Sequence, residues 1–394
     1  MKIGHGVAPI PVPNGSPLGG YVDRRGGSSG VADPLEAHVM TMSDGATRLA
    51  LVVLDVVCVN TDLAGAVQDA LAEHIDESWV CATHTHSGPE TGCAPRGATT
   101  PEPWLDVVTA AVRQAARAAV AAEMSGSLIT TTVNVAGVAS VRSRPGAARH
   151  VPVDVVTFRT RSGHIGGALL VLPVHPTVLP AASTVVSADL AGAVRRAMSA
   201  TRKVPWVVVA TGAAGDISTR GVRRAGDPGE CARLGRLVAD QVLAVVRTGP
   251  SRVDDTDSVF TATTDVIMTA AAPPTTQQST VDPQSRQAET LRQARRLRRP
   301  STNPIPATIR AARVGDLRLI GVPGEPFLDL RTRAAGAVLL GYVGGYIGYL
   351  PTTEAFAGEP TYETVISPVA PGEPERLIDA GVELLTRLDQ KSAT

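Results

Sequence analysis

Apolar residues recur along this chain with two alternating spacings. The run at 50–59 is almost continuously apolar and predicts a buried strand. Leu63, Val67 and Leu71 follow at helical spacing and predict an amphipathic helix that Thr61 caps. Further apolar runs predict strands at 79–83, 153–159, 167–174, 204–210, 258–268, 307–314 and 317–322. Helical spacing predicts helices at 103–124, 189–198 and 230–246, after Pro326, and at about 374–388.

The order of these elements predicts the fold class. Strands that alternate with helices are typical of α/β proteins. Some neighbouring strands have no helix between them, so we expect mixed β-sheets flanked by helices. The first thirty residues are rich in Gly, Pro and Ser and are predicted to be mostly loop. No internal repeat divides the chain, and we expect residues 1–394 to form a single domain.

Composition and charge narrow the class of protein. The 394 residues are 43% hydrophobic and 19% charged, which is typical of a globular chain. Lys+Arg and Asp+Glu both number 37, so the chain lacks the basic excess of a nucleic-acid-binding surface, and we expect no nucleic-acid partner. The N-terminus has no signal-peptide pattern, and no apolar run is long enough to span a membrane. We therefore expect a cytoplasmic protein.

The four cysteines do not suggest a disulfide framework or a zinc–thiolate site. Cys58, Cys81, Cys93 and Cys231 form no Cys-x-x-Cys pair. Two of them, Cys58 and Cys81, lie in apolar runs, where a free cysteine behaves as a small core residue.

Arginines gather between Arg286 and Arg299. Within this cluster Ala288, Leu291 and Ala294 have helical spacing, which predicts a surface helix with a solvated basic face. The alternative is that the basic face recognises an acidic group on a substrate or partner.

Several polar residues follow directly after predicted strands. His84 and His86 follow the strand at 79–83, and His175 follows the one at 167–174. Asp216, Ser218 and Glu325 follow later strands in the same way. In α/β folds the loops beyond strand ends converge on one crevice, so these residues are candidates for a shared site.

Each of these signals also has a structural explanation. His84-Thr85-His86 places two imidazoles on one side of an extended segment, a common arrangement for metal ligands, but loop histidines also form ordinary hydrogen bonds. A metallo-β-lactamase site would need Asp-His after His-x-His, whereas this chain has Ser87-Gly-Pro89. Glu325 opens a predicted helix, where the helix dipole favours a carboxylate in any case. Ser218 lies in neither a nucleophile elbow nor a P-loop.

Taken together, these segments resemble the neutral ceramidase family. The matching motifs occur in the family's order and span nearly the whole chain. They are Gly20-Tyr21, Asp33-Pro-Leu35, Ala82-Thr-His-Thr-His-Ser-Gly-Pro89, His175-Pro-Thr-Val178, Val186-Ser-Ala-Asp189, Gly212-Ala-Ala-Gly-Asp-Ile-Ser218, Pro323-Gly-Glu-Pro326 and Tyr346-Ile-Gly-Tyr-Leu-Pro-Thr352.

The resemblance implies a zinc-dependent amide hydrolase. Members of the family cleave the amide of N-acylated lipids with one zinc ion, and the matching ligands here are His84, His175, Glu325 and Tyr349. Zinc-activated water then attacks the amide carbonyl. The implied substrate is a small-molecule N-acyl amide, either ceramide-like or a smaller N-acylated metabolite of bacterial type.

The resemblance also implies four catalytic residues, which are His86, Arg142, Ser218 and Tyr362. In the mechanism that we expect, His86 handles protons and Asp216 or Ser218 orients it, while direct attack by Ser218 is an alternative. Tyr362 donates to the carbonyl oxygen. Arg142 matches an arginine that is expected near the substrate. Arg144, two residues further on, is a second candidate for that position. The family's secretion signal and C-terminal β-sandwich have no counterpart in this sequence, so we expect only the catalytic part of the family fold.

Two rival functions stay open at this stage. The same zinc site can serve an esterase, a lactonase or an acyl transferase. The fold can also serve a metal-free binding protein, although the complete ligand set argues against that reading.

Overall fold

The computed structural model describes residues 1–92, 99–143, 148–246, 258–272, 285–298 and 304–392. Within these ranges helices flank mixed sheets, so the predicted α/β class is confirmed. The largest sheet has nine strands in the order β10-β8-β7-β6-β1-β3-β4-β5, with β11 paired to β6. These strands are β1 (Lys2–Ile10), β3 (Leu35–Ser43), β4 (Arg48–Leu54), β5 (Glu77–Ala82), β6 (Met124–Val141), β7 (Ala148–Thr160), β8 (Ile165–Leu172), β10 (Val207–Thr211) and β11 (Ile217–Ser218).

A second sheet and two short strand pairs complete the β-structure. The second sheet has the order β12-β13-β14-β16, and only its β14–β16 pair is parallel. Its strands are β12 (Val259–Met268), β13 (Ile305–Val314), β14 (Leu317–Gly321) and β16 (Val338–Leu340). The short parallel pairs are β2 (Gly30–Val31) with β9 (Val185–Val186), and β15 (Glu325–Pro326) with β17 (Tyr349–Leu350).

The helices cover the outer faces of the two sheets. They are α1 (Thr61–Leu71), α2 (Trp104–Ala121), α3 (Asp189–Ser199), α4 (Pro228–Val246), α5 (Arg286–Leu297), the 3₁₀ helix η1 (Leu328–Ala334), α6 (Thr353–Ala357), α7 (Tyr362–Ile366) and α8 (Glu373–Ser392). In the described ranges none of them is long and apolar enough to cross a bilayer.

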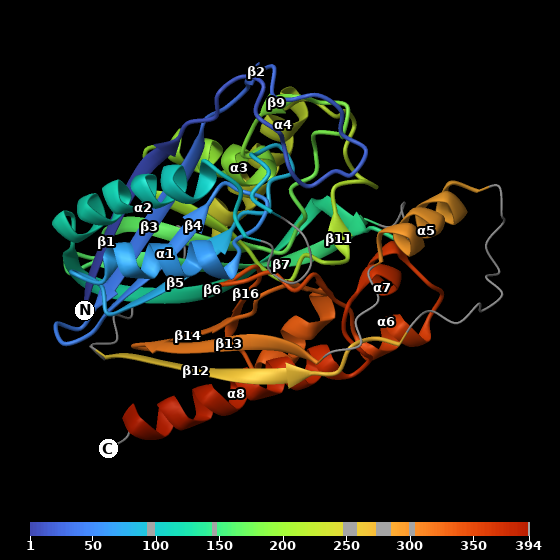
Figure 1. Ribbon diagram of the computed structural model, residues 1–394. Helices are drawn as coiled ribbons and strands as arrows, with labels where there is room; N and C mark the ends of the chain where they lie inside the picture. The colour runs from blue at the N-terminus through green and yellow to red at the C-terminus, as the bar shows by residue number, and fades with distance from the viewer. Residues whose placement is uncertain (93–98, 144–147, 247–257, 273–284, 299–303, 393–394) are drawn as a thin grey trace.

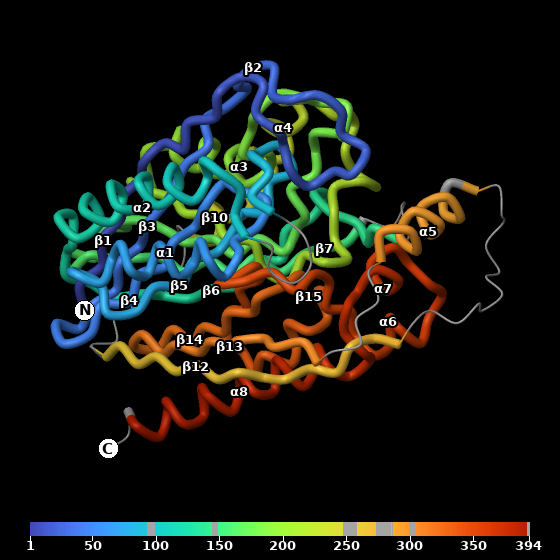
Figure 2. The backbone as a smooth tube through the Cα atoms, viewed as in Figure 1, coloured from blue at the N-terminus to red at the C-terminus, as the bar shows by residue number. Residues whose placement is uncertain are grey.

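Four layers stack on one another (Figure 1). Helices α1 to α4 pack on one face of the large sheet, the second sheet packs on its other face, and α8 runs along the outer face of the second sheet. The apolar core between the sheets holds the fully buried Trp79 and Phe158. The backbone trace shows the C-terminal third of the chain assembled below the large sheet (Figure 2).

The expectation that the first thirty residues are mostly loop is confirmed for 11–29, but it missed the strand β1 at Lys2–Ile10. Glycines in this strand look like loop residues in the sequence. A Cβ on Gly4 would lie 2.0 Å from the carbonyl oxygen of Ala119, and one on Gly6 would lie 2.0 Å from that of Ala115. These glycines let helix α2 approach the strand closely, which is a packing requirement rather than a turn signal.

One further strand was missed from the sequence, and one helix was assigned to the wrong type. The eighteen-residue strand β6 (Met124–Val141) was not predicted, because its Ser, Thr and Gly content hides the alternation and its register shifts between Val135 and Ala139. The helix predicted after Pro326 is the 3₁₀ helix η1 instead of an α-helix. Helix α1 buries Leu63, Val67 and Leu71 as predicted, although its N-cap is Asn60.

Candidate metal centre

The predicted strand-end residues meet where the two sheets adjoin. His84 and His86 follow β5, and His175 follows β8 in the large sheet. Glu325 follows β14 of the second sheet and lies in β15, where it pairs in register with Tyr349 of β17. Residues from distant parts of the chain therefore form one buried cluster, as the convergence of strand ends predicts.

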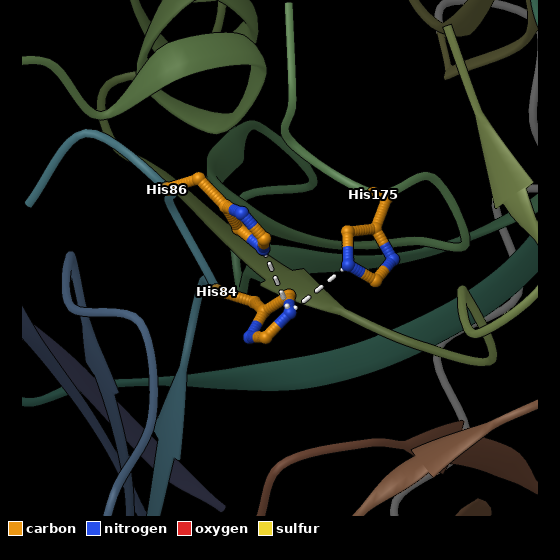
Figure 3. Close-up of side chains that lie close together, drawn as sticks. All are labelled: His84, His86 and His175. Atoms are coloured by element: carbon orange, nitrogen blue, oxygen red, sulfur yellow. Dashed lines mark hydrogen bonds between the residues drawn. The ribbon is translucent and has the colours of Figure 1, made fainter. Parts of the chain in front are cut away.

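Three histidines form the centre of this cluster (Figure 3). The Nε2 atom of His84 lies 3.0 Å from that of His175 and 3.2 Å from that of His86. All three side chains are buried, and each offers a ring nitrogen within 4.8 Å of the others. Among the described residues this is the one group of His, Cys, Asp and Glu with the spacing to hold a metal ion.

The tautomers of two histidines follow from their second nitrogens. The Nδ1 of His84 lies 2.5 Å from the carbonyl oxygen of Val57, and the Nδ1 of His175 lies 3.2 Å from that of Ala214. A carbonyl oxygen only accepts, so both Nδ1 atoms carry the hydrogen. Burial lowers the pKa of His84 to about 3 and that of His175 well below its usual value, so both rings are neutral.

The facing Nε2 atoms of His84 and His175 therefore both present lone pairs. Two lone pairs 3.0 Å apart repel each other unless a cation lies within reach of both. Imidazoles whose second nitrogen donates to a backbone carbonyl are also the usual form of histidine metal ligands. The donor set present in this chain fits a divalent metal ion with nitrogen and oxygen ligands, such as zinc.

His86 differs from the other two histidines. Its Nδ1 is buried and has no hydrogen-bond partner among the described residues. Its ring instead packs edge-on against Tyr21, with centroids 4.7 Å apart. Burial also holds the pKa of His86 well below its usual value. Its Nδ1 therefore lacks the backbone carbonyl that orients the other two rings, which suits a residue that exchanges protons better than a residue that holds a metal.

Glu325 supplies a carboxylate to the cluster. Its Oε2 lies 3.6 Å from the Nε2 of His84 and 3.5 Å from that of His175. The side chain is only 1% exposed, and this burial raises its pKa to about 7. Tyr346 donates a hydrogen bond to Oε1, while the hydroxyl of Tyr342 lies 3.4 Å from Oε2.

Tyr342 and Tyr346 were not assigned a role from the sequence. Tyr342 stacks on the ring of His84, with centroids 4.3 Å apart. Both stacked residues have left-handed backbones, with φ of 61° at Tyr342 and 63° at His84. Such conformations are uncommon for bulky residues and occur where the surrounding structure enforces them. The signal in the sequence was the concentration of tyrosines among glycines at 341–349.

Arg142 and Tyr349 lie beside His175 in the cluster. Nη1 of Arg142 donates to the hydroxyl of Tyr349 over 2.9 Å and lies 3.5 Å from the Nδ1 of His175. Nε of Arg142 pairs with Glu363 at 3.4 Å. Burial raises the pKa of Tyr349 well above its usual value, while Arg142 opposes this shift. Arg144, the neighbouring candidate, lies outside the described residues.

The remaining candidates lie at different distances from this cluster. Tyr362 packs edge-on against Tyr349, with centroids 6.1 Å apart. Ser218 forms a parallel bridge with His175, and its Oγ accepts from the backbone N–H of Arg220. Asp216 accepts from the N–H of Leu328. Across the described ranges no hydrogen bond joins Asp216 or Ser218 to His86.

The fold is shared with two solved structures. A ceramidase complexed with C2 matches 99% of this chain and 75% of its own chain, with a TM-score of 0.78 and 17% sequence identity. Neutral ceramidase from Pseudomonas aeruginosa matches 99% of this chain and 74% of its own chain, with a TM-score of 0.79 and 18% identity. No protein-family model and no curated protein matches the sequence. The chain thus has the neutral-ceramidase fold, as its motifs predicted.

Proposed function

Because the chain has the neutral-ceramidase fold, we propose that it is a zinc-dependent hydrolase of N-acyl amides, ceramide-like or smaller. One observation carries this proposal: the facing lone pairs of His84 and His175, with the Glu325 carboxylate 3.5 to 3.6 Å from both. One zinc ion per chain would be held by His84, His175, Glu325 and Tyr349. The proposed catalytic unit is the whole chain, because the proposed ligands come from the segments after β5 and β8 of the large sheet and from the short β15–β17 pair in the C-terminal part.

A zinc ion bound there supplies two kinds of chemistry: it lowers the pKa of a water molecule and polarises a carbonyl group. The residues of the chain supply the rest. His84 and His175 are neutral, and Glu325 accepts a hydrogen bond from Tyr346. All three side chains are buried, and electrostatic interactions are stronger in such a site than in water. Tyr349 is held in place by the 2.9 Å hydrogen bond from Arg142.

His86 is the proposed proton carrier. Its Nε2 lies 3.2 Å from that of His84, and among the described residues no group holds its Nδ1. It accepts a proton from the attacking water and delivers it to the leaving nitrogen. The water oxygen forms a bond to the acyl carbon, the carbon–nitrogen bond breaks, and the products are a carboxylic acid and an amine.

Tyr362 and Arg142 are the proposed stabilisers of the carbonyl oxygen. Both lie against Tyr349. A phenol and a guanidinium are hydrogen-bond donors of the kind that stabilise an oxyanion. We assign Ser218 and Asp216 structural roles beside His175 and η1 in this mechanism, because their side chains accept hydrogen bonds from backbone N–H groups, those of Arg220 and Leu328.

The test is amide hydrolysis by the zinc-loaded protein and by a His86→Ala variant. N-acyl amides of increasing acyl length are incubated with each protein, beside their ester counterparts, and the free amine or alcohol is quantified. We expect amide cleavage by the wild type and a loss of roughly 10²- to 10⁴-fold in kcat for His86→Ala, with bound zinc retained. Cleavage of the esters alone, or full amide activity in the variant, would contradict the proposal.

A further inference from the structure

Arg24 is a cation without a counter-ion at the edge of the candidate site. Its Nη1 donates to the carbonyl oxygens of His86 and Gly19, at 2.5 and 3.0 Å, and its Nε lies 3.4 Å from that of Ala181. Its Nη2 is buried without a hydrogen-bond partner. No described carboxylate forms an ion pair with it, whereas Arg142 nearby is paired with Glu363. Partial burial of an unpaired cation costs free energy unless an anion forms an ion pair with it.

The loop that carries Arg24 is held firmly against the histidine segment. The N–H of Gly19 donates to the carbonyl oxygen of Gly88 over 3.0 Å, and Leu18 forms a β-bridge with Pro89. A Cβ on Gly20 would lie 2.5 Å from Cγ of His86, so only glycine permits this approach. The guanidinium of Arg24 lies over the ring of Tyr21, which itself packs on His86.

The basic helix α5 lies beside the same loop. Nε2 of Gln293 donates to Asp23 over 2.9 Å, and Leu291 and Ala294 pack against α7, which carries Tyr362 (Figure 1). Arg295 and Arg296 on this helix are exposed. The whole chain has no net charge, so this concentration of arginines at one edge of the site is a local feature.

We propose that the substrate carries a carboxylate on the amine side of the scissile amide, and that Arg24 binds it. This inference rests on the proposed amide hydrolysis. We place the carboxylate on the amine side because Arg24 contacts the backbone of His86. In the proposed mechanism, His86 delivers a proton to the leaving nitrogen. The free Nη2 donor would pair with a carboxylate oxygen, and the arginines of α5 would attract such a substrate to the site. The substrate class is therefore N-acyl amino acids.

A matched pair of substrates tests this directly. N-octanoylserine and N-octanoylethanolamine differ only by the carboxylate, and kcat/KM is measured for both with the zinc-loaded wild type, Arg24→Gln, Arg24→Lys and Arg25→Gln. We expect the wild type to prefer the serine amide by about tenfold to a hundredfold, mainly through KM. Arg24→Gln should lose this preference, Arg24→Lys should keep part of it, and the control Arg25→Gln, at the exposed neighbouring position, should keep all of it.

Binding separates this inference from the proposed function. The corresponding octylsulfonamides of serine and ethanolamine cannot be cleaved as amides, and their Kd values are measured by calorimetry with the same proteins. If neither amide is cleaved, the proposed hydrolysis is wrong, yet tighter binding of the serine sulfonamide that depends on Arg24 still supports the carboxylate site. Equal binding of the two sulfonamides by the wild type, or a preference that persists in Arg24→Gln, overturns the inference.

Discussion

The Nε2 atoms of His84 and His175 face each other at 3.0 Å, and both nitrogens lack a hydrogen because the two Nδ1 atoms donate to the carbonyl oxygens of Val57 and Ala214. This arrangement could hold a metal ion. In an ordinary core pair, one ring would donate to the other. Here the backbone carbonyls accept both Nδ1 hydrogens, so His84 and His175 cannot donate to each other, and a cation between them would relieve the repulsion of their lone pairs.

Removing the hydroxyl of Tyr346 should weaken metal binding. Tyr346 donates to Oε1 of Glu325, so the Tyr346→Phe variant leaves that oxygen unpaired in a buried site. We expect zinc affinity to fall by roughly 10- to 100-fold, as for other residues that orient a ligand. The affinity is measured by competition with a chromophoric chelator.

Tyr362→Phe is the matched control for that measurement. It removes a hydroxyl from the same cluster, but Tyr362 contacts Tyr349 by its ring edge. We expect its zinc affinity to stay within about twofold of the wild type, while kcat for amide hydrolysis falls by roughly 10²- to 10³-fold, the usual cost of losing one oxyanion donor. Equal zinc affinities for wild type and Tyr346→Phe would exclude the positioning role of Tyr346.

The buried ion pair between Asp55 and Arg195 should be essential for stability. Asp55 is fully buried and accepts two hydrogen bonds from the guanidinium of Arg195, which joins the end of β4 to helix α3. Asp55→Asn leaves the buried cation with only the longer contact to Glu36, at 3.4 Å, and we expect a loss of about 3 kcal/mol in the free energy of unfolding. Urea denaturation measures this loss.

An exposed ion pair provides the control for Asp55→Asn. Arg333 and Asp379 make a comparable bidentate contact at the surface, with side chains 47% and 46% exposed. Asp379→Asn should therefore cost less than about 1 kcal/mol. Similar losses for the two variants would show that burial of the Asp55 pair is not what makes it important.

His5 should contribute to acid sensitivity. It stacks between His38 and Trp206, and burial, assisted by His38, lowers its pKa to about 3. Below its usual pKa of about 6.5 the unfolded chain binds a proton at this residue that the folded protein does not bind. The stability that His5 contributes is thus complete above pH 6.5 and is lost as the pH falls towards 3, by about 1.4 kcal/mol per pH unit.

This sign is tested by the slope of unfolding free energy against pH. Between pH 6 and pH 4 we expect this slope to be shallower in His5→Gln than in the wild type. The difference should be about 1.4 kcal/mol per pH unit, which corresponds to one proton. His74→Gln serves as the control, since His74 is 53% exposed. A slope for His5→Gln equal to that of the wild type would contradict the assignment.

Much of the fold was predictable from the sequence because hydrophobic spacing directly reflects burial. The apolar face of α1 and the strands after which His84 and His175 stand are examples. The failures have physical causes. In β1, Gly4 and Gly6 serve helix packing but look like loop residues. In β6, a register shift and many hydroxyl side chains obscure the alternation.

The candidate site was predictable in part for a different reason. Convergence of strand ends made His84, His86 and His175 candidates for a shared crevice, and the structure brings them together. Spacing along the chain cannot show, however, which other groups contact the residues of the site. That Tyr346 donates to Glu325, or that Arg24 lacks a counter-ion, depends on where loops far apart in sequence fold back. These contacts became visible only in three dimensions.

The metal content of the purified protein tests the central claim most directly. The wild type, His84→Ala and the exposed-site control His74→Ala are equilibrated with zinc, freed of excess metal and measured by elemental analysis. We predict about one zinc per chain in the wild type and in His74→Ala, and almost none in His84→Ala at unchanged secondary structure. A wild type without zinc, or a His84→Ala variant that binds as much as the wild type, would contradict the metal centre on which the proposed hydrolysis depends.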